Sequence, residues 1–239
     1  MGFGIYSTIA GANARNIELE VIANNIANVN TVGFKEVRPS FNAELQGNEE
    51  SGDESQVLVS HSGNHIDFAP GQVFPTGNEL DVAIQGDGFF EVQTPQGVRY
   101  TRSGNFVVNS ERVLCTPAGH PLASQDGNIT VPNTGRVTFS PSGEISVNGE
   151  HVGSLKLVSF KNTQPFQLEG GNLFNHNGAE GAGSKKFKLV QGYLEASNVN
   201  VIANMARMIE VSRAYESHQK SISKQMKAAE MLQQIAKIN

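Results

Sequence analysis

Two histidines have the spacing that comes nearest to a metal-binding pair in this sequence. His61 and His65 stand four residues apart, and a helix presents two imidazoles to Zn²⁺ at that spacing. Gly63 and Asn64 lie between them, however, and these residues favour a turn over a helix. We therefore predict a turn here and no metal site.

A glycine-rich stretch and a thiol are the other candidates for chemistry. The stretch from Gly178 to Lys186 contains Gly183-Ser184-Lys185, whereas a phosphate-binding loop needs Gly-Lys followed by Ser or Thr, between a strand and a helix. We interpret it as a flexible hairpin. Cys115 is the single cysteine and lies in a strand-like run, so we expect a small buried side chain rather than a nucleophile. With no Gly-x-Ser-x-Gly elbow and no plausible carboxylate pair, the sequence predicts neither an enzyme nor a cofactor site.

Composition and charge narrow the classes of partner. The chain has 239 residues, enough for one large or two modest domains, and its formal net charge of -5 argues against a nucleic-acid partner. No apolar run approaches the roughly 18 residues of a membrane span. The segment from Met1 to Ala14 lacks a charged region followed by a long apolar run, so we expect no cleavable secretory signal. The sequence predicts a soluble chain, or one that leaves the cell by another route.

The elements that must position any site begin with a patterned N-terminal segment. Apolar and amide residues of this segment recur at alternating spacings of four and three residues, which is a 3.5-residue repeat. Arg15, Glu18 and Glu20 do not belong to this stripe. The stripe comprises Ile5, Ile9, Ala12, Asn16, Leu19, Ala23, Ile26 and Asn30. It predicts a helix that packs against another helix.

The C-terminal segment repeats this pattern. No Gly or Pro occurs between about Val199 and Lys237, so we expect one helix of roughly 60 Å at 1.5 Å per residue. Its stripe comprises Val201, Met205, Met208, Ser212, Tyr215, Gln219, Ile222, Met226 and Ala229. Two interpretations stay open: an ordinary helical hairpin within one chain, or termini that pair with each other and then with neighbouring subunits. For Arg207 with Glu210, and Arg213 with Glu216, we expect local ion pairs at a spacing of three residues.

The middle of the chain, from Phe34 to about Gln191, has the pattern of an all-β domain. Short apolar runs alternate with turn residues such as Asn148-Gly149, which supply the positive φ that tight hairpins require. The predicted strands are 81–84, 89–94, 98–101, 106–109, 113–116, 129–131, 137–139, 145–147 and 155–160. The stretch from Gln46 to Gln56 is acidic and predicts a mobile loop.

Three sequence blocks resemble one protein family. The stretch Asn25 to Lys35, which ends in Thr31-Val32-Gly33-Phe34-Lys35, is similar to the N-terminal signature of bacterial flagellar rod and hook proteins. Leu80 to Phe90, followed by Tyr100 to Phe106, resembles the family's central motif, and Gln191 to Asn200 resembles the segment that leads into its C-terminal helix. The blocks follow the family's order along nearly the whole chain.

The resemblance implies an α+β protein in which the N- and C-terminal helices pair as a coiled-coil-like core domain with an inserted all-β domain. The expected divisions are 1–33 for the N-terminal helix, 34–79 for an extended connector with the acidic loop, 80–190 for the β-rich domain and 191–239 for the C-terminal helix. Asn25, Thr31, Gly33, Phe34, Gly86, Gly88 and Phe89 are expected as structural motif residues.

The resemblance also implies assembly. The chain would polymerise with copies of itself and other axial proteins, after export through the flagellar type III apparatus, as a rod subunit of the basal body that crosses the periplasm. The expected interface residues are Ile5, Ile9, Ala12, Leu19, Ile26, Asn28, Asn30, Met205, Met208, Ile209, Tyr215, Ile222 and Met226. Short length and the opening Ile5 to Ile9 favour a proximal over a distal rod member. A β-domain adhesin or binding module, oligomerised through a coiled coil, is the alternative.

Overall fold

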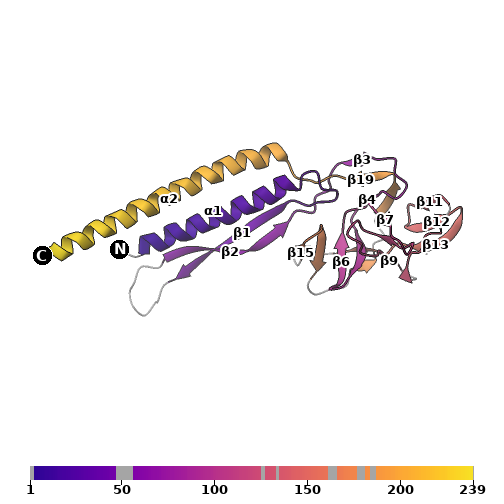
Figure 1. The fold of residues 1–239 in the computed structure, drawn as a ribbon, viewed down its shortest axis with the longest axis horizontal. Helices are drawn as coiled ribbons and strands as arrows, with labels where there is room; N and C mark the ends of the chain where they lie inside the picture. Colours follow the sequence, from indigo (N-terminus) through magenta and orange to yellow (C-terminus); the bar gives the residue numbers. More distant parts are fainter. Residues whose placement is uncertain are drawn as a thin grey trace. The chain divides into compact units, whose positions relative to one another are not determined.

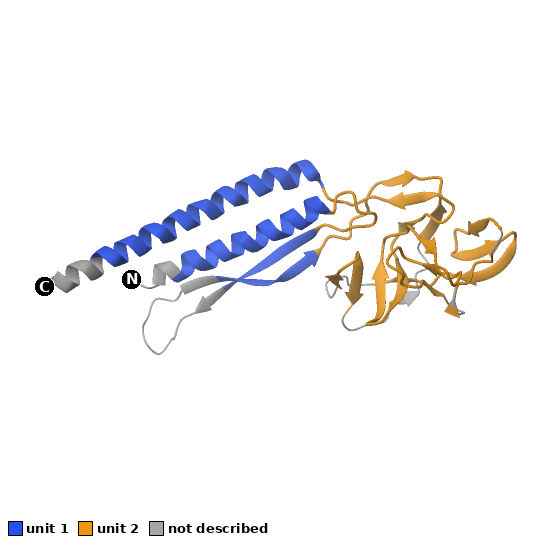
Figure 2. Ribbon diagram, viewed as in Figure 1, with its two compact units in different colours: residues 1–27, 37–65, 200–239 blue, residues 28–36, 66–199 orange. Residues whose placement is uncertain are grey.

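The protein consists of two compact units, each described here by itself (Figure 2). The computed structural model describes residues 3–46, 56–124, 127–132, 135–160, 166–176, 181–183 and 187–238. Most of the acidic loop predicted from Gln46 to Gln56, and most of the glycine-rich stretch from Gly178 to Lys186, therefore lie outside the described residues. The predicted α+β class is confirmed, with a helix near each terminus and a β-rich region between them (Figure 1).

The first unit joins three separate segments, 1–27, 37–65 and 200–239. It holds α1 (Phe3–Ala27), α2 (Val201–Ile238) and a ribbon of β1 (Val37–Gln46) and β2 (Gln56–Ile66). The two helices run side by side, with the ribbon along α1 (Figure 1). Asn200 begins α2 because its side-chain oxygen accepts a hydrogen bond from the Ala203 N–H at 3.0 Å, which makes it the N-cap. Neither helix has a described stretch long and apolar enough to cross a membrane.

The helix surfaces that become buried differ from the predicted stripes. On α1 the buried residues are Ala12, Glu18, Ile22 and Asn25, of which only Ala12 belongs to the stripe. On α2, Asn204 and Val211 are buried, each one residue before a predicted position. The Cβ of any larger residue at Gly11 would lie 3.0 Å from the His218 ring, so the helices approach closely there. A 3.5-residue repeat thus located the helices but not their contact faces.

The β ribbon of this unit corrects the turn predicted between the histidines. His61 and His65 both lie in β2, so about 13 Å of extended chain separates them at 3.3 Å per residue. That separation is too great for one metal ion. In the part of the chain that the structure describes, no three His, Cys, Asp or Glu side chains gather as metal ligands.

The second unit comprises residues 28–36 and 66–199 and is built from short antiparallel strands (Figure 2). Its largest sheet has the order β15-β16-β6-β5-β14-β17. The strands are β3 (Val73–Pro75), β4 (Val82–Gly86), β5 (Phe89–Thr94), β6 (Gly97–Thr101), β7 (Val107–Val108), β8 (Leu114–Cys115), β9 (Ala123–Ser124), β10 (Gly127–Asn128), β11 (Val137–Phe139), β12 (Glu144–Val147), β13 (Glu150–Ser154), β14 (Leu157–Ser159), β15 (Phe166–Glu169), β16 (Leu173–His176), β17 (Ala182–Gly183), β18 (Phe187–Gln191) and β19 (Tyr193–Glu195).

The predicted turn chemistry is confirmed at the hairpin of β12 and β13. Val147 pairs with Glu150 across Asn148 and Gly149, whose φ angles of 52° and 88° are those of a type I′ turn. Cys115 is 1% exposed in this unit, and burial raises the pKa of its thiol, so it packs as a small core residue as predicted.

Two apolar clusters form the core of the β-rich unit. The larger contains Val82, Phe90, Leu114, Ile145 and their neighbours. The smaller is mostly aromatic: Phe89 meets Phe68 and Phe166 with ring centroids 5.2 and 5.1 Å apart. The first pair is edge-to-face and the second is tilted by 34°, and both geometries favour one fixed arrangement of strands. The motif residue Phe89 is therefore part of the core of this unit.

Candidate subunit interface

Three large apolar side chains form an exposed stripe on α2. Ile202, Met205 and Ile209 follow one another at spacings of three and four residues, and they are 82%, 50% and 57% exposed. Met226, further along the helix, is 55% exposed. Contiguous apolar surface of this kind is typical of protein interaction sites. Two of the predicted interface residues, Met205 and Ile209, therefore lie together on the free face of this helix.

The other predicted interface residues of α2 and α1 lie in different environments. Met208, Tyr215 and Ile222 are half-buried on α2, as are Leu19 and Ile26 on α1. On α1, Ile9 is 46% exposed, beside the more exposed Tyr6, whereas Ala12 is buried within the chain. Beyond α1, Asn28 is half-buried and Asn30 is exposed. Ile5 belongs to α1, but its side chain lies outside the described part of the structure. The structure thus brings only a subset of these residues onto open helix surface.

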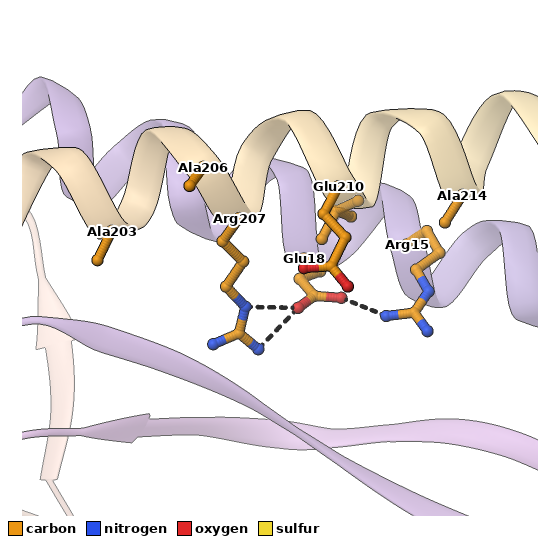
Figure 3. Close-up of a pocket in the computed structure, with 8 residues that line it drawn as sticks. Arg15, Glu18, Ala203, Ala206, Arg207, Glu210 and Ala214 are labelled. Carbon is orange, nitrogen blue, oxygen red and sulfur yellow. Dashed lines mark hydrogen bonds and ion pairs between the residues drawn. The ribbon is translucent and has the colours of Figure 1, made fainter.

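A buried carboxylate joins the two helices of the first unit (Figure 3). Glu18 of α1 is 4% exposed and accepts hydrogen bonds from Arg207 of α2, at 2.9 Å from Nε and 2.7 Å from Nη2. Its other oxygen lies 2.7 Å from Arg15. These contacts correct the sequence analysis, which put Glu18 off the packing stripe and expected Arg207 to pair locally with Glu210.

A surface groove of about 520 Å³ runs beside Glu18. Its floor and walls are formed by small residues of α2 and by the charged groups that surround the carboxylate (Figure 3). The lining residues are Arg15, Glu18, Ala203, Ala206, Arg207, Glu210, Val211 and Ala214. Alanines leave room for another backbone or side chain to approach the helix closely.

Replacing Glu18 with Gln is expected to lower the free energy of unfolding by about 1–2 kcal/mol. The amide keeps the shape of the carboxylate but loses charge-assisted bonds to two arginines, which are half-exposed and regain water. Urea unfolding followed by far-UV circular dichroism measures the change. Glu20→Gln is the matched control, because Glu20 is exposed and accepts a hydrogen bond from Asn16 within α1. Equal midpoints for both variants would contradict the structural role of Glu18.

The asparagines of the N-terminal motif make bonds within the chain. Asn25 is 2% exposed and forms a pair of hydrogen bonds with the backbone of Val37: its Nδ2 donates to the carbonyl at 2.7 Å, and its Oδ1 accepts from the N–H at 2.9 Å. The Thr31 hydroxyl donates to Asn28 Oδ1 at 3.1 Å. For Asn25 and Asn28 the structure therefore shows hydrogen bonds within the chain.

Gly33 and Phe34 follow in tightly packed positions. Gly33 has a φ of 67°, and its N–H donates to the carbonyl of Glu195 at 2.7 Å. A Cβ at Gly33 would lie 2.6 Å from the backbone of both Arg102 and Ser103. Phe34 is 3% exposed. Only glycine fits this conformation and this close approach.

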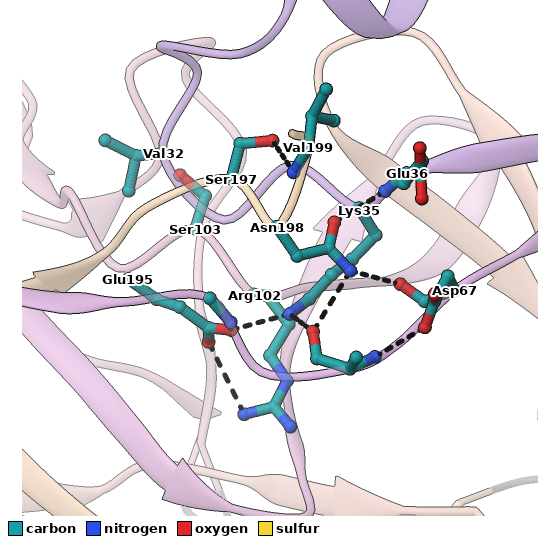
Figure 4. A network of polar contacts seen from close by, with 12 residues as sticks. Val32, Lys35, Glu36, Asp67, Arg102, Ser103, Glu195, Ser197, Asn198 and Val199 are labelled. Carbon is teal, nitrogen blue, oxygen red and sulfur yellow. Dashed lines mark hydrogen bonds and ion pairs between the residues drawn. The ribbon is translucent and has the colours of Figure 1, made fainter. Parts of the chain in front are cut away.

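Lys35, Arg102 and Glu195 form a buried charged cluster next to Gly33 (Figure 4). Lys35 is 0% exposed, and its ammonium group donates to Glu195 Oε1 at 2.6 Å and to the Ala69 carbonyl at 2.9 Å. Arg102 Nη1 lies 3.8 Å from Glu195 Oε2. Burial lowers the pKa of Lys35 and of Arg102, and the Glu195 carboxylate opposes part of both shifts. The cluster holds segments from three parts of the sequence together.

The central motif also supports this cluster. Arg102 donates to the carbonyl of Gly86 at 2.8 Å, and its guanidinium lies 5.3 Å from the centre of the Phe89 ring. Gly86 has a φ of 102° at the end of β4, whereas the Cβ position at Gly88 meets nothing closer than 3.7 Å. Gly86 and Phe89 thus help to position Arg102.

Comparison with known proteins decides the family. Three family models match the chain: "Flagella basal body rod protein" over residues 5–35, "Flagellar hook protein FlgE/F/G D1 domain" over 83–147, and "Flagellar basal body rod FlgEFG protein C-terminal" over 190–238. The flagellar basal-body rod protein FlgF of Caulobacter vibrioides is 38% identical over 84% of each chain. The chain belongs to the flagellar rod and hook protein family.

Other members of the rod and hook family match over a larger share of the chain. The flagellar basal-body rod protein FlgG of Buchnera aphidicola is 33% identical over 95% of this chain and 96% of its own. FlgG of Bacillus subtilis is 32% identical over 92% and 93%. The family of these rod proteins is a structural family and not an enzyme family. The sequence analysis likewise found no candidate active site.

The sequence analysis missed several residues that this site requires. Glu195 and Arg102 lay inside the quoted family motifs but were given no role, and Gly71 and Gly104 were not singled out. A Cβ at Gly104 would lie 1.7 Å from the Val82 carbonyl oxygen, and one at Gly71 would lie 1.9 Å from that of Ala196. A charged residue beside apolar neighbours, Leu194 and Ala196, was the available signal for Glu195, whereas the polar neighbours of Arg102 gave none. No local signal marks the two glycines, since their contacts come from distant strands.

Proposed function

We propose that this chain is a structural subunit of the bacterial flagellar basal-body rod, which polymerises into the axial drive shaft that transmits torque and encloses the export channel. The observation that carries the proposal is the exposed stripe of Ile202, Met205 and Ile209 on a helix that matches the family's C-terminal model. A monomer that leaves such a stripe in water gains stability when a neighbouring subunit covers it. Repetition of one heterologous contact that does not close into a ring yields a filament.

In this proposal the terminal helices pair as a coiled-coil-like core domain, and the β-rich region is a domain inserted between them. The predicted divisions at 1–33, 34–79, 80–190 and 191–239 serve as its working boundaries. The close approach of Gly11 to His218 and the bonds between Glu18 and Arg207 support pairing of the helices. The exposed Ile9 on α1 and Met226 on α2 are proposed to contact neighbouring subunits, with the half-buried interface residues completing those contacts.

The proposed partners are copies of this chain, other rod and hook proteins, and the flagellar type III export apparatus. Assembly with axial proteins follows from family membership. Passage through the export apparatus is a further proposal, which we base on the sequence resemblance. The proposed location is the rod where it crosses the periplasm. No nucleic acid, small-molecule substrate, cofactor or membrane insertion is part of this function.

Within the rod we favour the proximal position, the prediction made from the short chain and its opening residues. The identity of 38% to the FlgF rod protein supports this choice, and the 33% identity to a FlgG rod protein keeps the distal position as the alternative. The comparisons do not favour a β-domain adhesin.

A density map of intact basal bodies, from a strain that carries this chain with a small tag on the β-rich unit, tests the proposal. We expect density for the helices in the wall of the rod and the tag label at its proximal part. Label at the distal part would replace the proximal assignment. Basal bodies without this chain would refute the proposed function.

A further inference from the structure

Segments from near the two ends of the chain meet around the buried charged cluster of Lys35, Arg102 and Glu195. The Gly33 N–H donates to the carbonyl of Glu195 at 2.7 Å, and the Glu36 N–H donates to Asn198 Oδ1 at 2.7 Å. The ion pair of Lys35 and Glu195, at 2.6 Å, joins the same two stretches of sequence. Its partners are 160 residues apart in sequence.

A third segment is bound into the same cluster (Figure 4). Lys35 donates to the carbonyl of Ala69, and the Gly71 N–H donates to Glu195 Oε1 at 2.9 Å. The Ala196 N–H donates to the Gln72 carbonyl at 2.8 Å. Residues 69–72 therefore form hydrogen bonds with both of the other segments. No one of the three segments completes its polar contacts alone.

The charges make the three segments depend on one another. Glu195 is 2% exposed, and its Oε2 has no hydrogen-bond partner among the described residues, with Arg102 at 3.8 Å. Loss of Lys35 would leave this carboxylate buried with only that distant cation, and loss of Glu195 would leave two buried cations facing each other. An uncompensated buried charge is far more costly than a lost surface pair. Loss of either side chain should therefore open the surrounding backbone, and not only change the positions of neighbouring side chains.

We propose that this cluster is a cooperative latch: residues 32–36, 69–72 and 193–198 open and close as a single unit, separately from the core of the β-rich unit. Opening of residues 32–36 is then transmitted to residues 193–198 through Glu195, and the reverse also holds. The inference does not depend on the proposed function, because it concerns only the isolated chain. Local cooperative units that open before global unfolding are a general property of proteins.

Amide hydrogen exchange on the full-length chain tests the latch. In Lys35→Met, exchange at Gly33, Glu36 and Ala196 is expected to accelerate by on the order of tenfold to a hundredfold, by the same factor at all three. The amide of Leu114, which donates to the Ile129 carbonyl in the larger core cluster, should keep its wild-type rate. Equal acceleration of exchange at Gly33, Glu36 and Ala196 would indicate that the segments open as one unit.

Two further variants make the outcome decisive. Glu195→Gln preserves the shape of the side chain and should accelerate exchange at Gly33, Glu36 and Ala196 by equal factors, with Leu114 unchanged. This variant tests the latch if Lys35→Met does not fold. Arg136→Met is the control, because Arg136 pairs with Glu79 at 2.9 Å with 79% of its side chain exposed, and exchange should not change. Acceleration at Gly33 without Ala196, a uniform acceleration that includes Leu114, or wild-type rates throughout would each overturn the proposal.

Discussion

Cells whose chain carries Ile209→Asp are expected to lose swimming motility and to assemble no complete rod. Ile209 is 57% exposed, so the free energy of unfolding of the isolated variant should differ from that of the wild type by no more than about 0.5 kcal/mol. In an assembled rod, however, the carboxylate would be buried against a neighbouring subunit without a partner, at a cost of several kcal/mol for each contact. The cost recurs at every subunit, so even a moderate penalty at one interface prevents polymerisation.

Motility plates and electron microscopy of basal bodies measure the loss, and thermal unfolding of the purified variant shows that the fold survives. Ile209→Leu is the matched control, since it keeps an apolar side chain of the same volume and should swim normally. Met205→Asp, on the same stripe, should reproduce the defect. Complete rods that contain the aspartate variant would exclude this stripe as a subunit interface.

Gly33→Ala is expected to lower the free energy of unfolding by about 3–5 kcal/mol. An added methyl group would meet the Arg102 carbonyl carbon and the Ser103 nitrogen at 2.6 Å, and neither backbone atom can move without disturbing the Lys35, Arg102 and Glu195 cluster. The left-handed φ of 67° adds a smaller cost that any side chain would incur.

Gly77 separates these two costs. Its φ of 74° is nearly the same, but no atom lies within 4 Å of the position that a Cβ would take. Gly77→Ala should therefore cost only about 1–2 kcal/mol, the conformational part alone. Denaturant unfolding of both variants gives the difference. Similar losses at the two positions would show that the close approach at Gly33 can relax.

The sequence predicted those features of the fold that depend on local pattern. The helices were evident because no Gly or Pro interrupts the segment after Val199, and the hairpin at Asn148-Gly149 because two adjacent residues supply the positive φ. The ribbon of β1 and β2 was missed, since Pro39 interrupts the first strand pattern and Gly63 the second. Strand pairing outweighed those local preferences.

The candidate site was less predictable because its contacts join distant residues. Glu18 was placed off the packing stripe by its spacing, yet it is buried because Arg207, 189 residues away, supplies the compensating guanidinium. The exposed stripe was predicted in part: Met205 and Ile209 were named, but the 3.5-residue repeat suggested Ala12 as well, and that side chain is covered within the chain. A periodic pattern identifies apolar positions but does not tell which neighbour covers them.

The three-segment construction of the helical unit has a kinetic consequence. Residues 1–27 and 200–239 can meet only after the intervening polypeptide has contracted, and loop-closure entropy delays such long-range contacts in folding. The folding transition state should thus contain β-hairpins, with Glu18 and Arg207 still apart. Substitutions at this pair will mainly raise the unfolding rate and leave the refolding rate almost unchanged, so the helix pair governs how long a folded monomer persists.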